Sequence, residues 1–255
     1  EIGNAPKEAG VNRAVWDLRY DPATPAASDR AAGGFGGGGG GRFGFRGSAM
    51  AVPGEYTVTI NAGGQTMTKT ARVATDPRTK IPEADLQAQL DALLALRELL
   101  SRVNGVIDRT EDLTKQLTTV AEMLKKQAPA TTTSSAGNGQ GGAREGGQSG
   151  APGPAGAALE KAIADLKSLR SQLTRPIPMG YRYPPQLREE VSSLASAIGG
   201  VMARPTDPQT TRLDELKRET ERVVSTLNTF VTRTIPEINA MLAQTPHVVA
   251  GTAIK

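Results

Sequence analysis

Apolar and polar positions alternate along the N-terminal part of the chain. Across residues 11–20, VNRAVWDLRY, one side carries Trp16, Leu18 and Tyr20, and the other side carries charged residues. A period of two is typical of a β-strand with one buried face. We therefore predict a half-buried strand here, which holds the only tryptophan of the chain.

The same period returns after a Pro-Gly turn. In residues 52–60 the apolar side includes Tyr56 and Ile60, with threonines between the apolar positions. A glycine-containing turn follows, and residues 65–75 supply a returning strand with Met67 facing inward. Strands joined by a short glycine turn form a β-hairpin.

These strands are too few for a complete sandwich. An immunoglobulin-like sandwich needs about seven strands, whereas residues 1–77 show signals for three. We expect residues 1–77 to form a small or incomplete antiparallel β-sandwich. The glycine-rich run within 31–49 cannot offset its ordering entropy by burial, so we interpret it as a flexible insertion in a surface loop.

The spacing of apolar residues then changes to three or four, which is the period of an amphipathic helix. One leucine-rich stripe predicts a helix of about 40 residues over 83–124, roughly 60 Å long. Further stripes predict helices at about 157–174, 186–203 and 208–243. None of these helices can bury its stripe alone. We expect an elongated up-and-down helical bundle of about four helices, which makes the fold class α+β.

Proline and glycine divide the helical region. We expect this domain to span 78–245, with a low-complexity linker at 128–156 and a tail at 246–255. Prolines between 176 and 185 end the second helix. Pro236 is expected to kink the last helix. The stripes could instead serve a helix of another chain, but burial within one bundle is the simpler interpretation.

Composition narrows the class of partner. Of 255 residues, 30 are basic and 26 acidic, and they are spread along the chain without the dense basic stripe of a nucleic-acid binder. No apolar run approaches the ~20 residues of a membrane-spanning helix. The lack of cysteine excludes disulfides and thiolate zinc sites. Because the chain opens on Glu1, we interpret it as a piece of a longer protein.

Candidate catalytic residues are sparse. The sole histidine, His247, lies in the tail, and we interpret it as a surface residue. Asp17 and Glu55 could be compared with a glycosidase pair, but retaining chemistry needs carboxyls about 5 Å apart across a cleft, which a hairpin does not supply. We therefore assign no catalytic, cofactor-binding or metal-binding residue, and we predict that the chain is not an enzyme.

Aromatic and apolar side chains are the candidate interaction residues instead. Aromatic residues with a polar end are common at protein interfaces. Those at the edge of the β module and in the proline-flanked segment MGYRYPP are Trp16, Leu18, Tyr20, Tyr56, Tyr181 and Tyr183. The competing interpretation of MGYRYPP is that it simply covers one end of the bundle.

Several motifs together resemble a known family. GVNRAVWDLRY, VPGEYTVTI, ARVATDPR, a long leucine-rich helix and a proline-containing last helix are similar to the region that follows the β-propeller in bacterial sortilin-like, VPS10-type BNR-repeat exported proteins. The resemblance covers nearly the whole chain outside the glycine-rich insertions. It implies that residues 1–77 are an immunoglobulin-like module similar to that of flagellar hook-capping proteins. The missing strands would then precede Glu1, and Trp16 would pack against the hairpin at Tyr56.

The resemblance also implies a function. A non-enzymatic accessory region would cap or dock the β-propeller of the same parent chain, or another envelope protein. The helices would serve as a spacer or partner-binding arm of a protein exported to the periplasm, the cell surface or the exterior. Two alternatives stay open: part of a glycosyl hydrolase- or peptidase-like protein whose catalytic residues lie upstream, or a structural subunit of a cell-envelope assembly.

Overall fold

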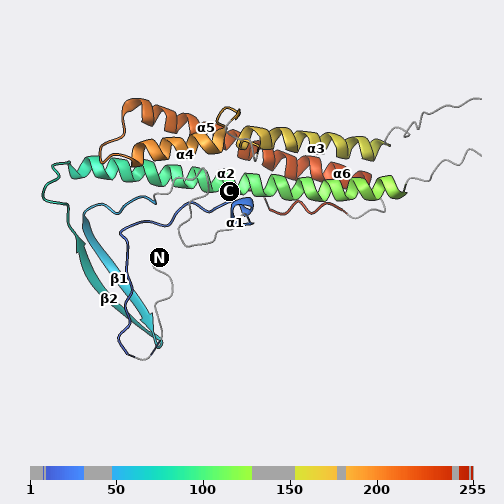
Figure 1. The fold of residues 1–255 in the computed structure, drawn as a ribbon. Helices are drawn as coiled ribbons and strands as arrows, with labels where there is room; N and C mark the ends of the chain where they lie inside the picture. Colours follow the sequence, from blue (N-terminus) through green and yellow to red (C-terminus); the bar gives the residue numbers. More distant parts are fainter. Residues whose placement is uncertain are drawn as a thin grey trace, which may run out of the picture. The chain divides into compact units, whose positions relative to one another are not determined.

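The computed structural model describes residues 8, 10–31, 48–127, 153–176, 182–242, 247–252 and 254. Within them the fold is mostly helical, with a single two-stranded antiparallel hairpin (Figure 1). The chain divides into a first compact unit, Glu1–Gly105 with Leu173–Arg222, and a second, Val106–Gln172 with Val223–Lys255. The division falls within continuous helices.

The predicted hairpin is confirmed. Strand β1, Gly54–Ala62, pairs in antiparallel register with β2, Gln65–Val73. Gly63 and Gly64 form the turn, with φ angles of 57° and 76°. Positive φ at both central positions is the geometry of a type I′ turn, which glycine adopts without steric cost. The glycine pair therefore sets the register of the sheet.

The strand predicted for residues 11–20 is wrong. In the described residues, the pairing there is an isolated antiparallel bridge between Arg19 and Met50. Asp17 explains the difference, because its Oδ1 atom accepts a hydrogen bond of 3.0 Å from the backbone N–H of Arg19. Leu18 takes a left-handed φ of 61°, which a regular strand does not contain. A local turn thus replaces the alternating backbone, and the described sheet is a hairpin with no sandwich around it.

The four predicted helical regions are confirmed, with ends shifted by a few residues. The first three are α2 (Glu83–Gln127), α3 (Pro154–Leu173) and α4 (Leu187–Gly199). The region predicted as one last helix contains α5 (Asp207–Thr229) and α6 (Ile235–Met241). α3 begins within the range predicted as a linker, of which residues 128–152 lie outside the described part. A π-helical segment, η2 (Phe230–Thr234), precedes Pro236. Proline lacks the N–H that an uninterrupted helix requires, which accounts for an irregularity at this place.

The sequence pattern does not predict the short helix α1 (Ala27–Ala31). The segment before it lies against α2 in the first unit. The side-chain amide of Asn104 donates to the carbonyl oxygen of Thr24 at 2.7 Å, and Ser101 Oγ accepts from the N–H of Thr24 at 3.0 Å. These bonds tie the N-terminal segment to a helix. Most of the predicted glycine-rich insertion, residues 32–47, lies outside the described part.

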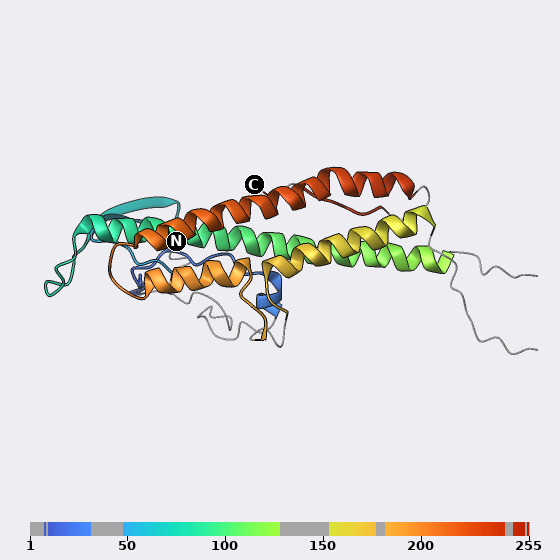
Figure 2. The same ribbon diagram turned by 90° about the horizontal axis from the view of Figure 1, so that it is seen from above.

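In the first unit, α4 and α5 lie beside the first part of α2 (Figures 1 and 2). Arg102 pairs with Glu221 at 2.9 Å, and Asp85 pairs with Arg204 at 3.8 Å. Both pairs join residues with the same separation in sequence, so α5 runs parallel to α2. α4 runs in the opposite direction, as both views show.

In the second unit, α3 runs antiparallel to the later part of α2. Glu111 pairs with Arg170 at 2.7 Å. Lys125, further along α2, pairs with Glu160, which is earlier in α3, at 3.2 Å. The end of α5, with η2 and α6, completes this unit.

The predicted apolar stripes form the cores of both units. Buried side chains from the stripes are Leu96, Ile198 and Leu216 in the first unit, and Leu113, Leu117, Leu166 and Leu227 in the second. Full burial of such a side chain contributes about 1.5–3 kcal/mol. The hydrophobic effect therefore holds each helix to its neighbours.

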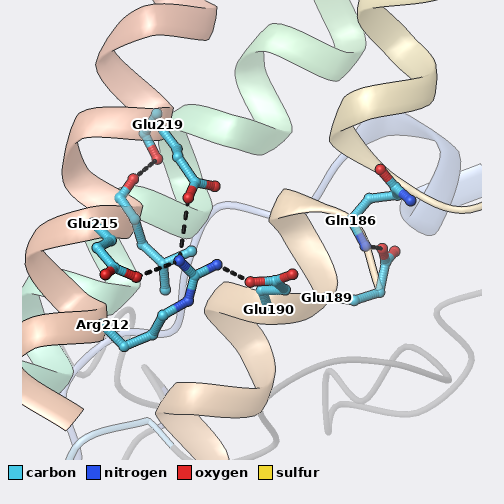
Figure 3. Close-up of polar contacts among 8 residues, drawn as sticks. Gln186, Glu189, Glu190, Arg212, Glu215 and Glu219 are labelled. Atoms are coloured by element: carbon cyan, nitrogen blue, oxygen red, sulfur yellow. Dashed lines mark hydrogen bonds and ion pairs between the residues drawn. The ribbon is translucent and has the colours of Figure 1, made fainter. Parts of the chain in front are cut away.

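A buried carboxylate binds both ends of the connection between α3 and α4. Glu189 is 9% exposed. Its Oε1 atom accepts a hydrogen bond of 2.8 Å from the Thr174 hydroxyl, and its Oε2 atom accepts one of 2.9 Å from the N–H of Gln186. Gln186 is the N-cap of α4, so the second bond satisfies a free N–H at the helix start (Figure 3).

Replacement of Glu189 by alanine is expected to lower the free energy of unfolding by about 1–3 kcal/mol, because it leaves buried donors without an acceptor. Chemical denaturation followed by circular dichroism measures the change. Glu98→Ala, at an exposed position of α2, is the control and should stay within about 0.5 kcal/mol of the parent. Equal effects of the two substitutions would contradict the capping role of Glu189.

Candidate interaction surface

One face of the hairpin carries an apolar pair that the described residues leave uncovered. Ile60 of β1 lies opposite Met67 of β2, and each is 53% exposed. The alternation in the sequence predicts that both face inward. They do share the face of Tyr56 and Val58, which are half-buried, but the described residues leave this face largely uncovered at the level of Ile60 and Met67. An exposed apolar pair of this kind is more typical of a contact surface than of a core.

The opposite face of the hairpin is polar. Thr57 lies opposite Thr70 and Thr59 opposite Thr68, and all four are exposed. Since the described sheet consists of β1 and β2 alone, each strand has one edge without a strand partner. Such edges pair readily with a further strand. A hairpin by itself is marginally stable in water, whereas a larger sheet with a covered apolar face is stable.

An aromatic pair lies at the end of the hairpin opposite the turn. The rings of Trp16 and Tyr56 are 5.1 Å apart with 64° between their planes, the edge-to-face arrangement that aromatic pairs favour. This confirms the expected contact between Trp16 and the hairpin. The Tyr56 hydroxyl donates to the carbonyl oxygen of Val52 at 2.6 Å. Burial, and then an electrostatic interaction with Tyr20, raise the pKa of Tyr56, so this hydroxyl stays a donor at neutral pH.

The neighbouring candidate residues lie next to the start of the hairpin. The carbonyl oxygen of Leu18 accepts from the N–H of Ala51 at 2.8 Å, and the N–H of Tyr20 donates to the carbonyl oxygen of Ala49 at 2.9 Å. Trp16, Leu18 and Tyr20 are half-buried and alternate with exposed residues. The structure thus brings these side chains to the hairpin without a regular strand.

The second group of candidate aromatic residues is only partly described. Tyr183 lies in the connection between α3 and α4 and is 51% exposed. Tyr181 falls outside the described residues. Exposure of Tyr183 is compatible both with a recognition edge and with a loop that covers a helix end.

The ionisable residues considered for catalysis do not form a common site. Asp17 accepts from the N–H of Arg19, and Glu55 lies opposite Arg72 in the sheet. His247 is exposed in the tail. Across the described ranges, no group of three or more histidine, cysteine, aspartate and glutamate side chains is placed to hold a metal ion.

A charged cluster joins α4 and α5 in the first unit (Figure 3). The guanidinium of Arg212 pairs with Glu190 of α4, with Glu215 at 2.7 Å and with Glu219 at 3.1 Å. The hydrogen bond to Glu215, and then those to Glu190 and Glu219, raise the pKa of Arg212 above its ordinary value. Because the guanidinium already lies among the three carboxylates, we interpret the cluster as a structural link between the helices.

Comparisons with protein-family models, with curated proteins and with solved structures found no match to this chain. Among the helices in the described ranges, none has both the length and the apolar character that crossing a bilayer requires.

Replacement of Arg212 by glutamine removes the cation that pairs with three carboxylates. We expect the free energy of unfolding to fall by about 1 kcal/mol at pH 7, between the values typical of exposed and buried ion pairs. Salt screens both these ion pairs and the repulsion between the carboxylates that are left. The deficit of the variant relative to the parent is therefore expected to shrink as the salt concentration rises.

Thermal unfolding of the Arg212→Gln variant at pH 7, over a range of salt concentrations, measures this dependence. Lys217→Gln breaks an exposed pair with Asp214 and is the matched control, with a smaller expected effect at pH 7. A deficit of the Arg212→Gln variant that stays constant over the whole range would contradict the electrostatic explanation.

Proposed function

We propose that this chain is a non-enzymatic accessory region that docks onto a β-rich domain through its hairpin. The observation that carries the proposal is the exposed pair of Ile60 and Met67 on a sheet with free edges. A further strand at one edge would satisfy backbone hydrogen bonds, and a covering surface would bury the apolar pair. Such a role requires no bond-making chemistry.

The partner we propose is the part of the parent protein that precedes Glu1, or another envelope protein. The resemblance to bacterial sortilin-like exported proteins supports an upstream β-propeller with immunoglobulin-like strands next to it. In this proposal the hairpin, with Trp16 packed against it, is one edge of an incomplete antiparallel β-sandwich. The protein would act in the periplasm, at the cell surface or outside the cell.

The helices serve, in this proposal, as a spacer or partner-binding arm. α2 is a continuous helix of 45 residues, which corresponds to about 67 Å at 1.5 Å per residue. Partner helices bury its apolar stripe within each of the two units. The bundle expected from the sequence would then hold a partner at a distance from the docked hairpin.

Two other roles would use the same docking surface. In a glycosyl hydrolase- or peptidase-like protein, this region would border an active site built upstream. In a cell-envelope assembly, it would be a structural subunit held through its helices. The exposed pair of Ile60 and Met67 favours docking in either setting and does not require a catalytic role for these residues.

Hydrogen–deuterium exchange of β1 and β2 tests the docking. The amides at the outer strand edges should exchange at least about tenfold more slowly in the full-length parent protein than in the isolated chain, because strand pairing protects them. Ile60→Lys and Met67→Lys in the parent should remove this protection, since a charged side chain is costly to bury. Thr59→Lys and Thr68→Lys, on the opposite face of the hairpin, are the matched controls and should retain it.

Equal exchange in the isolated chain and in the parent protein would contradict docking through the hairpin. Protection that is lost in the threonine variants instead would place the contact on the polar face. Turnover of a glycoside or peptide substrate by the isolated chain, abolished by Asp17→Ala, would contradict the non-enzymatic assignment.

A further inference from the structure

The C-terminal tail lies against helices of the second unit (Figure 1). Asn239 of α6 binds the backbone of Val248 twice: its Nδ2 atom donates to the carbonyl oxygen and its Oδ1 atom accepts from the N–H, both at 2.9 Å. Asn228 of α5 binds Ile254 in the same way, again at 2.9 Å. Each asparagine side chain thereby satisfies a backbone donor and a backbone acceptor of the tail.

The two asparagine contacts hold the tail at positions well apart along the helices. The two asparagines are about 16 Å apart along the helix axis at a rise of 1.5 Å per residue. Val248 and Ile254, six residues apart, bind at these two positions, which lie within the roughly 20 Å reach of six residues. A third amide comes from α2, where Oε1 of Gln116 accepts from the N–H of Val249 at 2.9 Å.

The tail is recognised mainly through its backbone. Val248 is 3% exposed and anchors the segment, whereas Val249 is 70% exposed and points away. The hydrogen bonds that the three amide side chains make with the tail all reach its backbone atoms. We call the residues that hold the tail, Gln116, Asn228, Asn239 and Arg109, the tail-binding surface.

Arg109 lies beneath the tail at Gly251. A Cβ atom at Gly251 would collide with the Arg109 guanidinium, and its φ of 62° is one that glycine adopts without strain. The Nε and Nη2 atoms of Arg109 are buried without a hydrogen-bond partner in the described residues. Docking the tail leaves these donors unpaired, which opposes docking. This cost offsets part of the free energy gained from the amide hydrogen bonds. We therefore expect the tail to dissociate from the surface and to rebind.

We propose that the tail-binding surface also accepts the tail of a second copy of this chain, so that two copies exchange tails. The second copy supplies the same backbone, the same Val248 anchor and the same glycine over Arg109. It therefore meets every contact that the tail makes within its own chain. Reciprocal exchange uses both surfaces and closes at two copies. The tethered tail competes through its high effective concentration, so exchange increases with protein concentration.

The lack of cysteine in the chain permits selective cross-linking. One full-length copy carries Thr119→Cys, one helical turn from Gln116, and the other copy carries Val249→Cys. A short bismaleimide links the two copies when the tail of one lies on the surface of the other. A chain with both substitutions gives the intramolecular product and checks the geometry. We expect a cross-linked heterodimer whose yield increases with protein concentration.

A substitution at Gly251 distinguishes exchange from random collision. In the Thr119→Cys copy, Gly251→Ala weakens the competing tail and should raise the heterodimer yield about fivefold or more. In the Val249→Cys copy, the same substitution weakens the tail that is donated and should lower the yield. Gly63→Ala is the matched control, because Gly63 has a similar φ of 57° but no neighbour near a Cβ atom, and it should leave the yield unchanged.

An intramolecular product without heterodimer at any concentration, even with Gly251→Ala in the Thr119→Cys copy, would overturn the proposal and leave the surface to its own tail. Loss of both products would also overturn it, because the surface would then be empty or occupied by another molecule. The result is independent of docking through the hairpin, since no residue of β1 or β2 takes part.

Discussion

Burial of the apolar stripe on α2 is the constraint on which the helical structure depends. Leu96 in the first unit and Leu113 in the second are both completely buried, and each such side chain contributes about 1.5–3 kcal/mol. A long amphipathic helix cannot cover its own stripe. In the first unit α4 and α5 cover this stripe. In the second unit α3 covers it together with the end of α5, η2 and α6. Because each partner has a stripe of its own, every contact buries two apolar faces at once.

Polar residues decide how the helices are arranged within this apolar packing. Ion pairs such as that of Arg102 with Glu221 are partly exposed and add little stability by themselves. These ion pairs form in only one alignment of the helices, because in other alignments the opposite charges do not meet. Glu189 and Arg212 act near the start of α4, the former by capping the helix and the latter by joining it to α5. Burial of apolar side chains drives the packing of the helices, and these polar contacts favour one packed arrangement over the others.

The two surfaces proposed for binding have different defects in their packing. At the first, apolar side chains stay exposed, and at the second, buried donors lack hydrogen-bond partners among the described residues. The hairpin keeps Ile60 and Met67 exposed on a sheet with free edges. The tail is held through its backbone over Arg109, whose buried donors lack partners in the described residues. Both surfaces present hydrogen-bonding groups to an extended peptide, and neither requires a particular side-chain sequence beyond a few apolar or small residues. This common chemistry suits association with other strands and tails.

The sequence by itself determined the helices and the hairpin, because apolar spacing and a glycine turn act over a few residues. The prediction of an N-terminal strand was wrong. There the side chain of Asp17 accepts a hydrogen bond from the N–H of Arg19, which competes with strand pairing. Only the tertiary structure decided which apolar residues stay exposed and what Asn228 and Asn239 bind. These contacts join segments whose alignment depends on the packing of whole helices. A polar residue on a helix face carries no local signal of its partner.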